Sequence, residues 1–474
     1  MLRRFPLFAV AAASVLLSVA SGAAVQAQSV VVGADQRSDL SLTVYQGGFA
    51  LVHDVRRASL PDGLATIILP DLSDRLDIAT IRLAVGENSQ VRSLTFDREV
   101  LSSRALLRRS VGKTVRIARV NPATGEETFE VAEVLALSPE LVLRIGDRIE
   151  TAIPGRIVFD DVPGDLRPAP GIVANVLVPT AGERTVSLSY ITDGLSWKTS
   201  YVGRLTEGAD RLELTVWALI DNQTNTAYPN VQISLISGQV NRAATRPGPP
   251  QPVARTLQAE IAVAGGVTFG ASGPYYRYAL PRTFNIRPRQ QTQVELMSSA
   301  AVPFVRKLRT EGGPLFNVRS TGMSQPVMVR LTIANETRNG LGVPMPAGQF
   351  SLFEAADGRE VFQGGASVTA TPVGTDMIVD LGRSFDVSFE RTVLDFDRTG
   401  TRNENIVTSQ RLTLKNGGSR PVQVDIVENF RGEWKIVRDS ERHAQISAFQ
   451  AMWTLTVPAG GEASVEYRAQ IGAR

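Results

Sequence analysis

The chain has 474 residues, of which 20% are charged, and it contains two histidines and no cysteine. The lack of cysteine excludes a thiol nucleophile, a thiolate metal site and an iron–sulfur cluster. The formal net charge of +3 falls to +1 without Arg3 and Arg4, and acidic and basic residues are interspersed. The sequence therefore offers no basic stripe that could neutralise the phosphates of a nucleic acid.

Residues 1–27 have the features of a signal peptide. Two arginines precede an apolar run from Phe5 to about Ala20, and Val25-Gln26-Ala27 has the small-x-small form of a cleavage site. We expect cleavage near Ala27 and a periplasmic or secreted mature protein without a transmembrane span. An uncleaved anchor is the alternative, but the run barely reaches the ~18–20 residues that a span requires.

Apolar and polar residues alternate with a period of two along most of the remaining chain. Leu212, Leu214 and Val216 are one example, and Val422, Val424 and Ile426 are another. This pattern is typical of strands with one buried face. Helical spacing is nearly absent, and Asp97–Arg108 is the best candidate for one short helix. We predict an all-β protein of tandem β-sandwich domains, with a small β-barrel insertion near residues 101–165.

Turn and linker signals divide the chain into successive segments. After the signal peptide we predict an N-terminal β domain over 28–98, a small barrel-like domain over 101–165, a β-sandwich part over 170–242, a flexible Pro/Gly-rich linker or loop over 243–274 and a C-terminal β-sandwich region over 275–474. The linker is rich in proline between Arg246 and Pro252, which prevents a regular ladder of hydrogen bonds. Such a long loop is either a mobile linker or a segment that binds a ligand or partner.

A short pattern recurs in the C-terminal half. Arg330–Asn335 matches Arg411–Asn416, and Leu212–Asn222 is a looser third copy. In each copy an alternating strand stops at an asparagine, which tolerates the left-handed conformation and whose amide can bond nearby backbone. We interpret the repeat as the hairpin pattern of a β-sandwich; a coincidence of common strand residues is the alternative.

The segment Leu195–Tyr201, with the preceding Tyr190-Ile191, resembles the signature of the bacterial domain of unknown function 4139 family. Three further segments are similar to that family, and a fourth resembles the N-terminal module of mucoidy-inhibitor-like proteins: Val231–Gly238, Ala301–Arg309, Trp453–Gly460, and Leu42 to Pro70. The resemblance implies a mostly-β architecture and export. It implies no established activity, so it transfers no catalytic residues.

The sequence departs from the family pattern at two places. Family members usually have an acidic–aromatic turn after the Asn-x-Thr step, but Asn222-Gln223-Thr224 is followed by Asn225–Tyr228. Many relatives have a long coiled coil between the two modules, where this chain has the barrel-like segment 101–165. The resemblance therefore implies no role that depends on that coiled coil.

Residues that could perform catalysis or hold a metal are few. His53 and His443 lie far apart, whereas a zinc site or a Ser-His-Asp arrangement requires convergent partners. Asp395 and Asp397 alternate with apolar residues, so they form either a carboxylate pair for glycoside hydrolysis or a solvated strand face. Asp160-Asp161 indicates a turn, and Asp221–Asn225 has too few acids for a dedicated calcium loop. We assign no catalytic, cofactor-binding or metal-ligating residue and expect no cofactor.

Aromatic and turn residues have mostly structural interpretations. We expect four strand aromatics, Trp197, Tyr201, Trp217 and Trp453, to fill cores. Tyr275–Tyr278 adjoins the linker, and alternation there would expose one set of rings to a sugar or peptide. The sequons at Asn222 and Asn335 indicate turn chemistry. The glycine pairs at 312–313 and 417–418 lack the following helix that a phosphate-binding loop requires.

Three functions remain open at this point. The leading hypothesis is an exported, non-enzymatic cell-envelope protein that contacts another envelope component by strand addition at an exposed sheet edge. A periplasmic carbohydrate- or peptide-binding protein is the first alternative, and a carboxylate-dependent hydrolase is the second. The expected partner is an envelope protein or a glycan, not a nucleic acid, and the sequence leaves the oligomeric state open.

Overall fold

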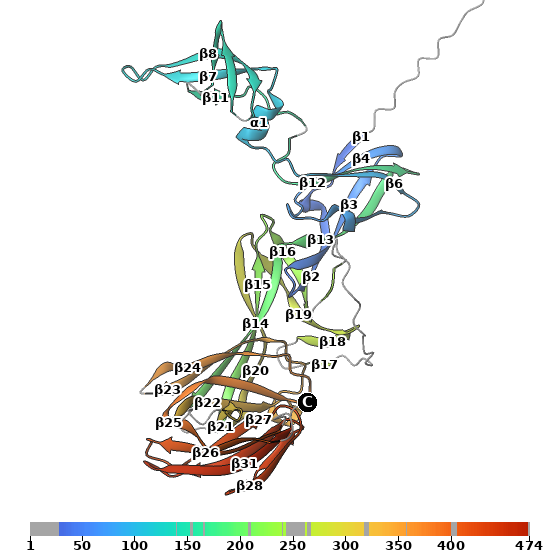
Figure 1. The fold of residues 1–474 in the computed structure, drawn as a ribbon. Helices are drawn as coiled ribbons and strands as arrows, with labels where there is room; N and C mark the ends of the chain where they lie inside the picture. The colour runs from blue at the N-terminus through green and yellow to red at the C-terminus, as the bar shows by residue number, and fades with distance from the viewer. Residues whose placement is uncertain are drawn as a thin grey trace, which may run out of the picture. The chain divides into compact units, whose positions relative to one another are not determined.

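The protein is built almost entirely from β-strands (Figure 1), which confirms the predicted all-β class. The computed structural model describes residues 28–138, 140–151, 155–164, 166–206, 210–238, 240–242, 261–262, 267–316, 322–356, 358–399 and 405–472. The predicted signal peptide lies outside these residues. No helix in the described ranges combines the length and the apolar character that crossing a bilayer requires.

Short helical segments interrupt the strands. The predicted short helix is present as α1 (Ser103–Arg109), which begins after Ser102, whose hydroxyl accepts a hydrogen bond from the Ala105 amide at 3.1 Å. A serine at this position satisfies one of the free amides of a helix start. Three 3₁₀ turns cover Ala34–Gln36, Ile78–Thr80 and Thr337–Asn339.

The described chain divides into two compact units. Unit 1 comprises Met1–Gln36, Arg57–Pro70 and Ala84–Val186, and unit 2 comprises Arg37–Arg56, Asp71–Leu83 and Ser187–Arg474. Unit 1 holds a four-stranded sheet with the following order: β1 (Gln28–Val31), β4 (Gly63–Leu69), β12 (Gly171–Val178), β6 (Gln90–Asp97). The parallel pairing of β1 with β4 and the antiparallel pairing of β4 with β12 fix its register.

Unit 1 also holds the segment predicted as a small barrel. Its strands form an open five-stranded sheet with the following order: β10 (Arg148–Glu150), β9 (Val142–Ile145), β8 (Glu127–Ala136), β7 (Thr114–Val120), β11 (Arg156–Val158). Within the described residues this sheet is not a closed barrel, which corrects the expectation. The two edge strands have only three residues each. The apolar cluster around Ile117, Val134 and Leu143 is already buried on one face of the open sheet, so its burial does not require that the sheet close into a barrel.

An eight-stranded sheet combines distant segments of the chain. Its order is β17 (Ile261–Ala262), β18 (Thr268–Ser272), β19 (Tyr275–Ile286), β16 (Tyr228–Ser237), β2 (Arg37–Tyr45), β3 (Phe49–Leu60), β13 (Gly182–Asp193), β5 (Arg82–Val85). Strands β17 and β18 fall inside the predicted 243–274 linker, so part of that segment is regular β structure. Residues 243–260 and 263–266 of it lie outside the described residues.

Unit 2 holds a five-stranded sheet with a parallel pair at its centre. Its order is β20 (Gln290–Pro303), β15 (Arg211–Asn222), β14 (Leu195–Thr206), β23 (Gly348–Ala356), β24 (Arg359–Val368). Alternation holds on β14, where Trp197 and Tyr201 are fully buried, as expected of core aromatics. Trp217 lies on the other face of β15 and is only half-buried.

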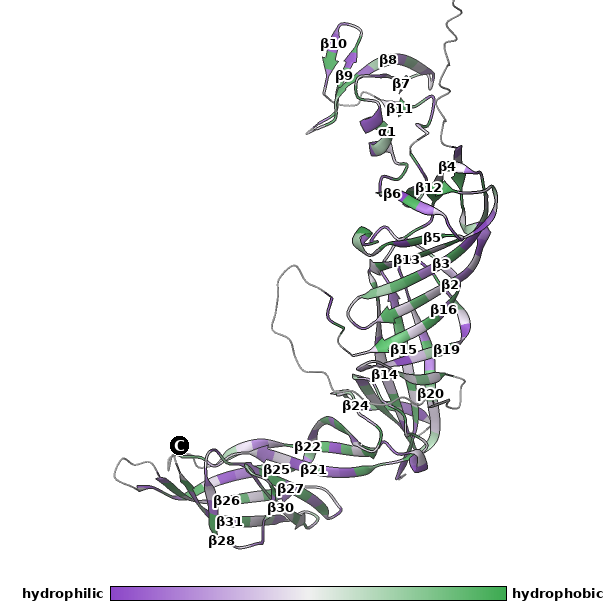
Figure 2. Ribbon diagram, turned by 90° about the vertical axis from the view of Figure 1, so that its right-hand side faces the viewer, coloured by the Kyte–Doolittle hydropathy of each residue, from purple (hydrophilic) through white to green (hydrophobic). Residues whose placement is uncertain are grey.

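The largest sheet, also in unit 2, has nine strands. Its order is β28 (Trp434–Asp439), β31 (Glu462–Gly472), β26 (Asn405–Asn416), β25 (Asp376–Thr399), β22 (Met323–Ala334), β21 (Val305–Gly312), β27 (Val422–Asn429), β30 (Gln450–Val457), β29 (Ala444–Ser447). Hydrophobic and hydrophilic residues alternate along these strands (Figure 2). Strands β31 and β30 lie near opposite ends of this order, but Tyr467 and Trp453 on them stack with ring centroids 5.1 Å apart. The sheet therefore curls around a shared core.

The repeated asparagines close three strands through their side chains. The Asn335 amide donates to the carbonyls of Val343 and Thr371 at 2.8 and 3.1 Å, and Asn416 and Asn222 make equivalent bonds. The repeat is therefore a structural device that satisfies the backbone of the following turn. These asparagines do not use the left-handed conformation that the residue tolerates, since the described non-glycine residues with positive φ are others: Asp71, Asn88, Asn230, Arg289.

Candidate functional site

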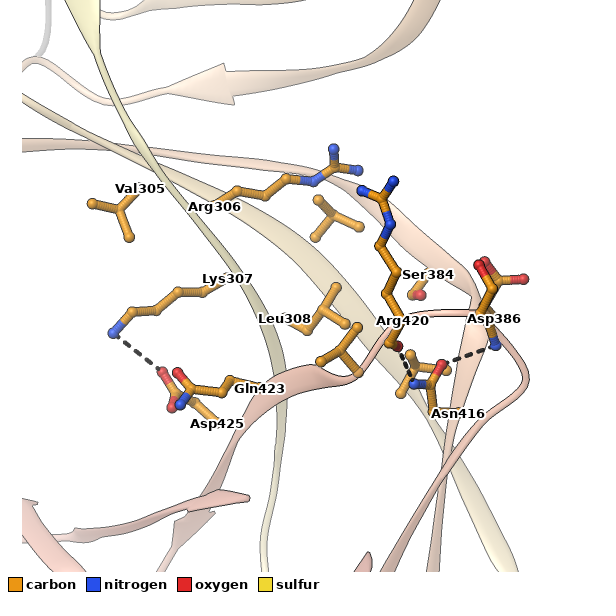
Figure 3. Close-up of a pocket in the computed structure, with 15 residues that line it drawn as sticks. Val305, Arg306, Lys307, Leu308, Ser384, Asp386, Asn416, Arg420, Gln423 and Asp425 are labelled. Carbon is orange, nitrogen blue, oxygen red and sulfur yellow. Dashed lines mark hydrogen bonds and ion pairs between the residues drawn. The ribbon is translucent and has the colours of Figure 1, made fainter. Parts of the chain in front are cut away.

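A groove of about 750 Å³ lies on unit 2, within the nine-stranded sheet. It is lined by the first half of β21, by Val329 of β22, by the turn after β26 and by the start of β27 (Figure 3). Strand β25 contributes Ser384, Asp386 and Val387. Segments that are distant in the sequence therefore present side chains to one concave surface, as is usual for ligand sites.

The turn after β26 is held in place by Asn416. Its buried amide donates to the Arg420 carbonyl at 2.8 Å and to the Pro458 carbonyl at 3.2 Å, and its side-chain oxygen accepts from the Gly418 amide at 2.9 Å. Only three residues lie between Asn416 and Arg420, so these bonds fix the backbone from which the Arg420 side chain projects. The asparagine device thus positions a cation at the rim of the groove.

A bulge in β25 forms the adjoining wall. Pro326 of β22 pairs with Ser388 and Met328 pairs with Arg383, so four β25 residues face a single residue of β22. The bulge leaves Phe385 with a relative exposure of 101% and places Asp386 in the groove. The Asp386 carbonyl accepts a hydrogen bond from the Gly417 amide at 2.8 Å, which joins the bulge to the neighbouring turn.

Three cations and two carboxylates line the groove. Lys307 lies 3.8 Å from Asp425, a carboxylate that also accepts a 2.7 Å hydrogen bond from Thr454. The guanidinium groups of Arg306 and Arg420 point toward each other (Figure 3). Among the described residues neither guanidinium makes an ion pair or a hydrogen bond.

This arrangement can bind an anion. A guanidinium presents several N–H donors in a planar fork that matches carboxylate and phosphate oxygens, and charge-assisted bonds of this kind are roughly twice as strong as neutral ones. The groove also contains the hydroxyls of Ser384 and Ser419, but its lining has no histidine. The described residues of the groove therefore offer binding groups and no nucleophile paired with a base.

The carboxylate pair considered for hydrolysis lies elsewhere on the nine-stranded sheet. Asp395 is about half exposed and forms an ion pair with Arg468 at 3.0 Å, and Asp397 accepts a hydrogen bond from the Arg398 amide at 2.8 Å. Neither residue lines the groove. This geometry agrees with the solvated strand face that was the other interpretation.

The two histidines have partners that the sequence does not reveal. His53 Nδ1 lies 2.8 Å from the Ser189 hydroxyl on a facing strand, and His443 Nδ1 lies 2.8 Å from Asp439. Burial of Asp439 favours its neutral form, but the hydrogen bonds and charge of His443 outweigh it and lower the pKa of Asp439. The structure brings neither histidine together with both a hydroxyl and a carboxylate, so a Ser-His-Asp arrangement is absent from these described contacts.

The tyrosine segment is divided between core and surface. Tyr278 is buried and packs against Trp197 and Phe269, with ring centroids 5.8 and 5.1 Å away. Burial raises the pKa of Tyr278 beyond the ordinary range of a phenol. Tyr276 retains 42% exposure. Only the exposed ring could contact a ligand, so the segment lacks the aromatic platform that alternation suggested.

The remaining candidates are turns. Asp160 is paired with Arg116, and Asp161 accepts from the Val162 amide at 2.8 Å. In the Asp221–Asn225 segment, Asn222 is buried and accepts from the Thr224 amide at 3.0 Å. The described residues contain no group of three or more acidic or histidine side chains that could hold a metal ion.

Sequence reasoning missed the two arginines of the groove. Arg306 lies on β21 and Arg420 in the turn after β26, far apart in the chain, so no spacing connects them. The sequence pointed to them only indirectly: Arg306 lies in the segment Ala301–Arg309 that resembles the family, and Arg420 follows the repeated Asn416. A search for arginines beside the repeated asparagines would have found Arg420.

One protein family matches this chain. The family model described as "Domain of unknown function (DUF4139)" covers residues 186–473, which include every residue of the groove. No curated protein matches the chain.

Proposed function

Because the chain belongs to the DUF4139 family, whose description assigns no activity, we propose that it is an exported, non-enzymatic binding protein of the cell envelope. Its groove on unit 2 holds an anionic group of the partner between Arg306 and Arg420. The observation that carries this proposal is the pair of facing guanidinium groups, which have no acidic partner among the described residues.

The charge balance of the groove supports an anionic ligand. Asp425 offsets Lys307, which leaves two arginines against the single carboxylate of Asp386. Two exposed like charges on one concave surface repel each other, and a bound anion would relieve this repulsion. The rim position also favours fast encounter with a negatively charged partner, an effect that salt weakens.

Export is proposed from the N-terminal sequence alone. The arginine pair, the apolar run and the cleavage form at Ala27 support a signal peptide. Fractionation of cells that express the full chain tests this: we expect the mature protein, beginning near Gln28, in the periplasm or medium. Recovery of the intact precursor in the cytosol would contradict it.

Binding is tested with fluorescein-labelled poly-L-glutamate as the probe. The mature protein should raise the anisotropy of the probe, and the double variant Arg306→Gln/Arg420→Gln should weaken binding by about tenfold or more, because charge-assisted hydrogen bonds are lost. The matched control is Arg438→Gln, an exposed arginine of β28 outside the groove, which should bind as the unmodified protein does.

Two results would contradict the proposed site. One is equal affinity of the double variant and the unmodified protein, and the other is absence of any probe binding at low salt. Poly-L-lysine serves as the opposite-charge probe and should not bind. Repeating the titration at higher salt should weaken the binding of poly-L-glutamate, since exposed charges are screened.

The two alternative functions have less support from the described contacts. For a sugar-binding site at Tyr275–Tyr278, burial of Tyr278 removes one of the two rings that the site would require. For hydrolysis, Asp395 is engaged by Arg468 on an exposed strand face. The groove offers a more complete set of convergent groups than either.

A further inference from the structure

Strand β21 has an unpaired edge inside the groove. It pairs with β22 from Val305 to Arg309, but it pairs with β27 on its other side only from Leu308 onward. Over Val305–Lys307, therefore, the described strands cover only one of its two edges. Backbone groups on such an edge are available to a further strand.

Continuing the register of β21 and β27 would place Val422 and Gln423 beside Arg306 and Lys307, but no pairing forms there. Strand β27 begins at Val422 and reaches its pairing with β21 at Val424. Asn416 bonds the preceding 416–420 turn to the Pro458 carbonyl and to its own backbone. The asparagine device thus fixes the turn that carries Arg420, and Arg420 lines the same groove as the unpaired edge.

We propose that an extended acidic peptide segment of an envelope protein adds as a short strand beside Val305–Lys307, with one of its carboxylates between Arg306 and Arg420. This inference rests on the proposed function, since it names the ligand of the same groove. Three residues of strand span roughly 10 Å, so the added strand is short and the peptide contributes about three residues to the pairing.

A peptide suits this site better than a compact anion does. The free edge presents both donors and acceptors, and only another backbone supplies both at the spacing of a strand. An apolar group also lies along it, since Val305 is 53% exposed. The fitting ligand therefore alternates acidic and apolar side chains, as a strand with period two does.

The test uses a blocked five-residue peptide of alternating valine and glutamate. Two further versions carry N-methyl groups at the odd or at the even positions, which removes backbone donors and retains every charge. The mature protein should bind the unmethylated peptide, and at least one methylated version should bind about tenfold more weakly. Hydrogen exchange at the amides of Val305–Lys307 should slow when the unmethylated peptide is bound.

The outcomes separate this inference from the proposed function. Equal binding of all three peptides, with no slowing of exchange at Val305–Lys307, would overturn strand addition, while a loss in Arg306→Gln/Arg420→Gln would leave the anion site standing. Equal binding by that double variant would instead remove the proposed function. Tighter binding of inorganic phosphate than of the peptide, with the same dependence on both arginines, would also overturn the peptide as ligand.

Discussion

Arg391 and Arg306 lie in the same nine-stranded sheet of unit 2, but their guanidinium groups have opposite surroundings. Arg391 is fully buried and bonds Glu428 and Gln410, with Nη1 2.6 Å from the Glu428 carboxylate. Arg306 is exposed and has no ion pair among the described residues. The charge of Arg391 is therefore neutralised within the fold, whereas the charge of Arg306 remains available to a ligand.

Both terminal nitrogens of the Arg391 guanidinium have polar partners in this buried cluster. Tyr467 donates a 3.0 Å hydrogen bond to Glu428, and burial together with the nearby carboxylate raises the pKa of this tyrosine well above its ordinary value. Burial of Arg391 disfavours its charge, but the bonds and charge of Glu428 outweigh it and raise the arginine pKa. Removing either partner leaves an uncompensated charge in the core.

The largest effect is expected from Arg391→Ala. It leaves Glu428 buried without its cation and should lower the free energy of unfolding by about 3–5 kcal/mol. Urea unfolding followed by tryptophan fluorescence measures the change. The double variant Arg391→Met/Glu428→Gln should recover part of the loss, since it removes both charges. A loss below about 1 kcal/mol in the single variant would mean that the pair contributes little.

The next effect concerns the repeated asparagine device. Asn335→Ala removes a buried amide that serves the carbonyls of Val343, Thr371 and Pro372, and we expect a loss of about 1–3 kcal/mol. The matched control is Asn339→Ala, in which a single 3.1 Å bond to the Ala334 carbonyl is lost. Urea unfolding should rank the first variant as clearly the less stable, and the reverse order would contradict the device.

A third expectation concerns the stability of unit 2 at low pH. Burial of Asp54 favours its neutral form, but hydrogen bonds from Arg37 and Arg56 outweigh it and hold the pKa of Asp54 below its ordinary 3.8. The folded state therefore binds fewer protons than the unfolded state near pH 4. The stabilisation is complete above the unfolded pKa and is lost as pH falls through the folded pKa.

The variant Asp54→Asn tests this dependence, because the amide cannot titrate. The difference in unfolding free energy between the unmodified protein and Asp54→Asn should be largest near neutral pH and should shrink below about pH 4. Urea titrations from pH 6 to pH 3 provide both curves. Parallel curves over this range would show that Asp54 does not contribute in this way.

The smallest effect is a gain of binding in the groove. Asp386 is its one carboxylate without an ion pair among the described residues, so Asp386→Asn should strengthen poly-L-glutamate binding by up to about fivefold. Anisotropy titration at low salt measures the gain, which should disappear at high salt. Weaker binding by this variant would contradict the charge account of the groove.

Much of the fold could be predicted from local patterns. Alternation located the strands, as on β15, where Leu212, Leu214 and Val216 are buried. Alternation could not predict which strands pair, because a period of two contains no information on distant partners. The parallel pairing of β14 with β23, which joins Thr199 to Gly348, is an example. For the same reason, the small-barrel prediction located the strands correctly but did not reveal that their sheet remains open.

The candidate site depends on tertiary arrangement even more. The repeated asparagine was visible in the sequence, and its side-chain bonding was predicted from the chemistry of the amide. The convergence of Arg306 with Arg420 was not, because it depends on how β21 pairs with distant strands and on a turn that tertiary bonds hold in place. Asp395 and Asp397, the carboxylate pair that the sequence brought into consideration, are neighbours on one strand and do not line the groove.

The groove arginines should serve binding and not folding, and one thermal unfolding experiment tests both parts. Without ligand, Arg306→Gln/Arg420→Gln should unfold at the same temperature as the unmodified protein, since surface changes of this kind alter stability by less than about 0.5 kcal/mol. With excess of the alternating valine–glutamate peptide, only the unmodified protein should unfold at a higher temperature. An equal rise in both proteins, or a marked loss of stability in the unliganded variant, would contradict the account.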